Sequence, residues 1–136
     1  MAEFISRSLE DTDSFAKELA SELQGTEVIA LFGDLGAGKT PLVRSIASHL
    51  GIKSGVHSPT FAIVNEYQGK FPVYHFDMYR ITDVDDLYST GYFDYLSTGI
   101  IIIEWSENIV ESIPDDAIRI ELKYGDDENT RIFRRM

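Results

Sequence analysis

The sequence predicts an α/β fold in which helices cover both faces of a mixed, partly antiparallel sheet. One observation is a short apolar strand pattern at 28–32, followed directly by a glycine-rich loop at 33–38 and then by a helix pattern. The other is a pair of strand patterns at 61–67 and 72–77 joined by a turn at 68–70, which makes part of the sheet antiparallel. The chain has 136 residues, so residues 1–136 are expected to form a single domain.

The first half of the chain is expected to hold two helices and a buried strand. Apolar residues recur at helical spacing over Asp11–Gln24, and Gly25 ends the pattern. The run Val28–Phe32 is apolar and rich in strand-forming residues, which is typical of a buried strand. Beyond the glycine-rich loop, helical spacing runs from Leu42 to Leu50, and Gly51 is suited to end that helix.

The second half begins with a loop at 58–61, because Pro59 disfavours helix at the residue before it. After the hairpin, Ile100–Glu104 is the most strand-like segment, with four isoleucines before an acid. The remaining patterns predict short helices at 83–89 and 92–96, a weak helix at 106–112, a strand at 117–124, a turn at 125–129 and a last strand at 130–133.

Composition excludes several classes of function. The chain has no cysteine, so thiolate chemistry and disulfides are excluded, and a metal must rest on oxygen or on one of three histidines. A formal net charge of -11 disfavours a protein that grips nucleic acid by itself, and it suits docking onto a basic partner. The N-terminus lacks the pattern of a signal peptide, and the apolar run Ile100–Ile103 is far too short to span a membrane, so a cytoplasmic location is expected.

The segment Gly33–Thr40 reads GDLGAGKT and matches the phosphate-binding pattern G-x-x-x-x-G-K-[ST]. Glycines let the backbone turn so that consecutive N–H groups face an anion, and the following helix adds its positive end. Lys39 supplies a mobile charge for the β and γ phosphates, and the Thr40 hydroxyl can ligate Mg2+. Because the motif lies between a strand and a helix, we expect the three-layer sandwich of P-loop NTPases, with ATP or GTP bound at this loop.

A magnesium ion in such a site also needs a carboxylate at the end of a neighbouring strand. Two strands offer one, since 74–77 ends in Asp77 and 101–104 ends in Glu104. Apolar residues before an acid are the general Walker B form, so spacing favours Glu104, directly or through water. For each acid, the alternative interpretation is a solvated side chain at a strand end.

Three other residues each allow a structural and a functional interpretation. Thr60 could belong to a switch segment that senses the γ phosphate, although from position alone an ordinary loop threonine is favoured. Trp105 is more readily a core residue than a ligand. His75 is more readily a packed strand histidine than a base, and the lack of a histidine nearby in sequence argues against zinc.

Taken together, four segments resemble the TsaE family, also called YjeE. They are GDLGAGKT, SPTF, YHFDMYR and IIEW, in this order, and the likeness runs from about Asp11 to Pro114. The resemblance implies a small bacterial ATPase required for making threonylcarbamoyladenosine (t6A) in tRNA. Such proteins do not transfer the threonylcarbamoyl group; they bind the TsaB–TsaD complex, and their ATP hydrolysis is thought to reset it between turnovers.

The resemblance also implies roles for individual residues. Mg2+ would be held by Thr40 and Glu104, Trp105 would lie beside the site, and the phosphates of ATP would contact Leu35, Gly36, Ala37, Gly38, Lys39 and Thr40. Asp77 and Thr60 would be needed for hydrolysis or its coupling. The acidic charge agrees with this, since the partners would hold the tRNA, and no tight direct tRNA binding is expected.

The sequence departs from the family in two places. Pro41 stands where the family usually has a second threonine, at the position that the resemblance assigns to the α-phosphate contact. Little chain follows Arg131, where many members carry a longer tail that would lie at the outer edge of the nucleotide pocket.

Two rival functions stay open from the sequence. A small-molecule kinase usually closes an arginine-rich lid over the phosphates, yet only Arg80 and Arg119 lie between the P-loop helix and the C-terminal strands. A nucleotide-sensing adaptor would bind ATP and barely turn it over.

Overall fold

A computed structural model describes residues 3–33, 39–52, 64–127 and 129–136. Its frame is a seven-stranded sheet in the order β1-β7-β6-β2-β5-β4-β3. The strands are β1 (Glu3–Ser6), β2 (Val28–Gly33), β3 (Val64–Gln68), β4 (Pro72–Asp77), β5 (Ile100–Glu104), β6 (Ile118–Tyr124) and β7 (Arg131–Arg135). The central strands β6, β2, β5 and β4 run parallel, and β7, β1 and β3 pair antiparallel to their neighbours. The predicted mixed, partly antiparallel sheet is therefore confirmed.

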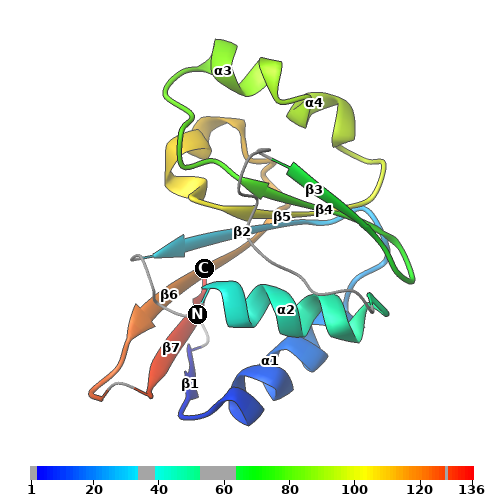
Figure 1. Cartoon of the computed structure of the whole chain (residues 1–136). Helices are drawn as coiled ribbons and strands as arrows, with labels where there is room; N and C mark the ends of the chain where they lie inside the picture. Colours follow the sequence, from blue (N-terminus) through cyan, green and yellow to red (C-terminus); the bar gives the residue numbers. More distant parts are fainter. Residues whose placement is uncertain (1–2, 34–38, 53–63, 128) are drawn as a thin grey trace.

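Helices cover both faces of the sheet, as Figure 1 shows. One face carries α1 (Leu9–Ser21) and α2 (Lys39–His49), which pack against each other and against alternate residues of β2, β5 and β6. The other face carries α3 (Val84–Ser89), α4 (Tyr92–Tyr95) and the 3-10 helix η1 (Ser106–Ser112). These three layers are the sandwich that the sequence predicts.

The burial of β5 explains its sequence. This strand lies between β2 and β4, and all five of its residues are buried. Ile100 and Ile102 pack with α1 and α2, whereas Ile101 and Ile103 pack in the core on the other face. A strand that is buried on both faces needs a continuous apolar run instead of an alternating one.

Short polar signals set where the helices begin. The Ser8 side chain accepts the backbone N–H of Asp11 at 3.1 Å, so α1 begins two residues before the predicted Asp11. The Asp83 side chain accepts the N–H of Asp86 at 2.8 Å and caps α3 in the same way. Helix α1 ends at Ser21, earlier than the predicted Gln24, although Leu23 still packs in the core.

Two elements differ from the sequence prediction in kind and not only in their bounds. Strand β1 was not predicted, and it pairs with β7 at the far end of the chain, register Phe4 with Phe133. The weak helix at 106–112 is a 3-10 helix. Among the described residues, no helix is long and apolar enough to cross a membrane.

Candidate nucleotide site

The candidate site lies at the carboxyl ends of the parallel strands. β2 ends at Gly33, β4 at Asp77 and β5 at Glu104, and Asp77 lies directly opposite Glu104 in the register. α2 begins at Lys39. In open α/β sheets this edge is where ligands bind, because the strand ends and helix N-termini converge there. Glycine is required at position 33, since its φ is 133° and an added Cβ would meet the carbonyl oxygen of Leu122.

Lys39 is the most unusual side chain at this edge. It is only 6 % exposed, and its buried Nζ has no hydrogen-bond partner among the residues that the structure describes. The ammonium lies 4.6 Å from the centre of the Trp105 ring, a cation–π contact. A buried cation without a hydrogen-bond acceptor is costly, which fits a residue that completes its contacts when an anion binds.

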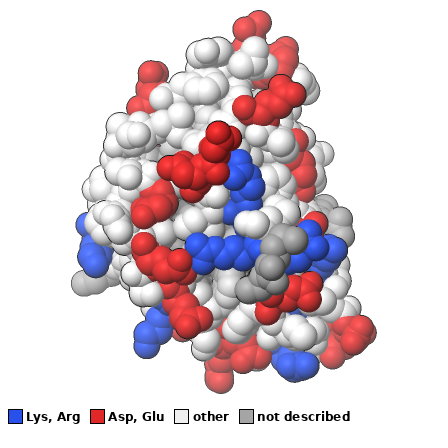
Figure 2. Space-filling view, turned by 180° about the vertical axis from the view of Figure 1, so that it is seen from behind, with Lys and Arg blue, Asp and Glu red and all other residues white. Residues whose placement is uncertain are grey.

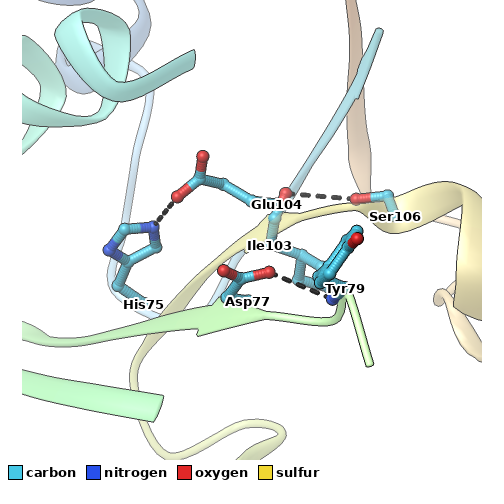
Figure 3. Close-up of polar contacts among 6 residues, drawn as sticks. All are labelled: His75, Asp77, Tyr79, Ile103, Glu104 and Ser106. Carbon is cyan, nitrogen blue, oxygen red and sulfur yellow. Dashed lines mark hydrogen bonds and ion pairs between the residues drawn. The ribbon is translucent and has the colours of Figure 1, made fainter. Parts of the chain in front are cut away.

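Glu104 is buried at the end of β5 and is paired with His75 (Figure 3). The distance from His75 Nε2 to Glu104 Oε2 is 2.6 Å, and the two side chains are 1 % and 8 % exposed. The sequence interpretation of His75 as a packed strand residue is correct, but it missed this pairing. The alternative interpretation of Glu104 as a solvated acid is wrong, because its side chain is buried.

Asp77 is half-buried beside this pair. Its Oδ1 accepts the backbone N–H of Tyr79 at 3.0 Å, which fixes the carboxylate at the strand end (Figure 3). Burial raises the pKa of Asp77, the bond from Tyr79 opposes that shift, and the nearby charge of Glu104 adds to it. The interactions of its carboxylate with His75 and Lys39 lower the pKa in part.

Trp105 follows Glu104 and turns the chain from β5 into η1. Its backbone has a φ of 61°, in the left-handed region that residues other than glycine rarely occupy. The ring of Tyr79 packs on the indole at 4.9 Å between centroids, and Lys39 also contacts that indole. The Trp105 indole thus lies against Lys39, at the edge where the strands end.

Two further polar residues of η1 contact the site, and the sequence analysis missed both. Glu107 accepts the backbone N–H of Gly33, the first residue of the phosphate motif, at 2.8 Å. The Asn108 amide donates to the carbonyl of Met78 at 2.9 Å and to that of Tyr79 at 3.3 Å. Both lie within three residues after Trp105, and this proximity was the only available signal.

The structure brings several of the predicted residues together. Lys39, Asp77, Glu104 and Trp105 are linked by the contacts and charge interactions above, and Thr40 lies beside Lys39 in the first turn of α2, partly buried. Leu35, Gly36, Ala37, Gly38 and Thr60 lie outside the described residues, as do residues 61–63 of the predicted strand.

The described residues also limit how a metal could be held. Within 3–33, 39–52, 64–127 and 129–136, no group of three or more His, Asp or Glu side chains could hold a metal ion alone. Mg2+ commonly keeps waters and takes one or two carboxylates plus phosphate oxygens. A hydroxyl at position 40 and a carboxylate at a strand end fit that mode, and they do not form an all-protein metal cage.

Comparisons with known proteins agree with this architecture. The model of the family described as "Threonylcarbamoyl adenosine biosynthesis protein TsaE" matches residues 6–133. A protein of Aquifex aeolicus named tRNA threonylcarbamoyladenosine biosynthesis protein TsaE is 40% identical over 138 residues, which are 99% of this chain and 98% of the relative. A Bacillus subtilis protein of the same name is 41% identical over 127 residues, 91% of this chain and 79% of the relative.

A solved structure agrees in fold as well. The crystal structure of Bacillus subtilis YdiB has a TM-score of 0.75 and 32% sequence identity, and the match covers 97% of this chain and 82% of that one. The resemblance seen in four short segments of the sequence thus extends over nearly the whole length. On these grounds, the chain belongs to the TsaE family.

Proposed function

We propose that this chain is an ATPase that supports t6A modification of tRNA by acting with a TsaB–TsaD-like complex. The single observation that supports ATP binding best is the buried Lys39 ammonium, which has no hydrogen-bond partner among the described residues. It lies at the start of α2, directly after the glycine-rich segment. An anion with several oxygens would satisfy that charge, and a phosphate chain fits it best.

In this proposal each side chain has a distinct task. Residues 35–40 contact the phosphates, and Lys39 supplies positive charge to the β and γ phosphates. Thr40 and Glu104 would hold Mg2+, which would supply positive charge against those phosphates. Asp77 and Thr60 serve hydrolysis or its coupling to the partner, and the closed packing of Trp105 on Lys39 limits water around the ammonium.

The rival function of a small-molecule kinase receives little support. Arg119, one of two candidate lid arginines, is engaged with the backbone: its guanidinium donates to the carbonyls of Pro114, Asp115 and Ala117. Only Arg80 is left as an exposed arginine between α2 and β6. An assay of products separates the rivals, because an ATPase releases free phosphate from ATP and water, whereas a kinase phosphorylates an acceptor.

The proposed partner role rests on charge and on the family. The net charge is -11, and Figure 2 shows acidic side chains spread from top to bottom of one face, with fewer basic ones among them. Such a surface repels tRNA and suits a basic protein surface. We therefore expect weak tRNA binding by the isolated protein and ATP hydrolysis that rises when the partner complex is added.

The experiment measures phosphate release from ATP by the purified protein, alone and with the partner complex. A rise in rate on adding the complex supports the proposal. Turnover that stays near zero in both cases favours the nucleotide-sensing adaptor. Tight, salt-sensitive tRNA binding by the isolated protein would contradict the proposal that the partner complex holds the tRNA.

A further inference from the structure

His75 and the two acids of the site project from one face of the sheet. Residues two apart on a strand share a face, so His75 and Asp77 lie on the same side of β4. Asp77 and Glu104 are direct partners in the parallel register, so Glu104 projects to that side too. Val73, Ile100 and Ile102 on this side pack with α1 and α2, so all three polar residues face the layer that contains Lys39.

The contact between His75 and Glu104 is a short, buried hydrogen bond. The separation of 2.6 Å is short, and His75 is 1 % exposed. A buried carboxylate is costly unless it accepts hydrogen bonds, and His75 Nε2 supplies a donor at Oε2. His75 Nδ1 is buried with no partner among the described residues, so a proton fits better on Nε2 than on Nδ1.

We propose that His75 is a positioning residue for Glu104: its Nε2–H fixes Oε2 and thereby sets the orientation of the other carboxylate oxygen for Mg2+. In Figure 3 that second oxygen points away from the imidazole. Hydrogen bonds to a metal ligand fix its orientation, and their loss typically weakens metal affinity by about 10- to 100-fold. This inference rests on the proposed function, because it requires that Glu104 serve the metal.

A matched pair of substitutions separates the donor from the packing. The amide nitrogen of glutamine reaches about as far from Cα as Nε2 of histidine, so His75→Gln keeps a donor. Methionine has a similar length and no donor, so His75→Met removes it. Affinity for a fluorescent, non-hydrolysable ATP analogue is titrated for each full-length protein, with Mg2+ and with a chelator.

With Mg2+, His75→Met should weaken binding by about tenfold, the lower end of the range for such contacts, and His75→Gln by much less. In chelator the three proteins should bind alike. In a Glu104→Gln background, His75→Met should cause no further loss of the Mg2+ effect, because the donor would have no carboxylate to position.

Equal Mg2+ effects in all three proteins, or an equal loss with and without Mg2+, would overturn the positioning role and leave the proposed function intact. A wild-type protein whose nucleotide affinity ignores Mg2+ would overturn both.

A second measurement needs no variant that must fold. In the NMR spectrum of the wild-type protein, a downfield imidazole N–H proton of His75 should be present and should shift when Mg2+ joins the nucleotide complex. A His75 ring without an Nε2 proton would overturn the assignment.

Discussion

Replacing Lys39 by methionine should stabilise the nucleotide-free protein while abolishing its function. Lys39 is 6 % exposed, and its ammonium contacts the Trp105 ring without a hydrogen-bond acceptor among the described residues. An unsatisfied buried polar group costs roughly 1–3 kcal/mol, and more when charged. The cation–π contact returns about 0.5–2 kcal/mol, and attraction to Asp77 offsets a further part.

The difference between these terms predicts that Lys39→Met raises the free energy of unfolding by about 1 kcal/mol, because methionine fills the same space without a charge. For a chain of this size, that corresponds to a rise in Tm of about 3–5 °C. Hydrolysis should fall at least ~100-fold, the usual scale for losing one preorganised electrostatic contact. Thermal melts without nucleotide and phosphate-release assays measure the two effects. Lys17→Met, at an exposed position of α1, is the matched control and should change neither.

A Lys39→Met protein that melts below the wild type without nucleotide would refute the stability cost assigned to the buried Lys39 ammonium. A Lys39→Met protein that hydrolyses ATP at the wild-type rate would refute the assignment of the site.

Three further predictions concern neighbouring residues. Pro41 lies in the first turn of an unbroken α2, where backbone N–H groups have no intrahelical partner; Pro41→Thr should tighten an ATP analogue by about tenfold, or ~1.4 kcal/mol. Pro41→Ala separates the N–H from the hydroxyl in the same titration, and equal affinities in all three would make the position neutral. Burial raises the pKa of Asp77 in the folded protein, so on raising the pH the unfolded chain loses this proton before the folded protein does. The contribution of Asp77 to the free energy of unfolding therefore falls as pH rises from about 4, the pKa of a free aspartate. Asp77→Asn should remove that loss and be the more stable protein near neutrality in urea denaturation; a less stable variant would contradict the assignment. Glu107→Ala removes the acceptor for the Gly33 N–H and should weaken nucleotide binding about fivefold, which corresponds to a loss of ~1 kcal/mol for one hydrogen bond. Glu107→Gln keeps an acceptor and should bind more like the wild type. Identical titration curves for all three proteins would show that this bond does not support the loop.

The sequence was most informative where one local pattern decides the structure. Ile100–Glu104 was predicted with its observed bounds, because a central strand buried on both faces requires a run of apolar residues. The hairpin was also predicted, since glycine and flanking strand formers signal it directly, although its turn lies at 69–71, one residue later than the predicted 68–70. By contrast, β1 depends on pairing with β7 across almost the whole chain, and its four residues have no pattern of their own.

The same distinction applies to the site. Lys39 and Glu104 could be found from local motifs, because Lys39 follows the glycine-rich segment directly and Glu104 ends the run of four isoleucines. The partnership of His75 with Glu104 joins β4 to β5, and its register becomes known only when the strands are placed side by side. Glu107 likewise reaches Gly33 over a separation of 74 residues, which no periodicity of the sequence encodes.

Multiple-turnover t6A formation on tRNA, reconstituted from purified proteins, tests the central claim most directly. The reaction contains the TsaB–TsaD-like complex with the threonylcarbamoyl donor and ATP, and this chain is omitted, added, or added as Lys39→Ala. The account predicts that t6A stops near one equivalent per complex without the chain or with Lys39→Ala, and continues through many rounds with the wild type. The same t6A yield in all three reactions would contradict it.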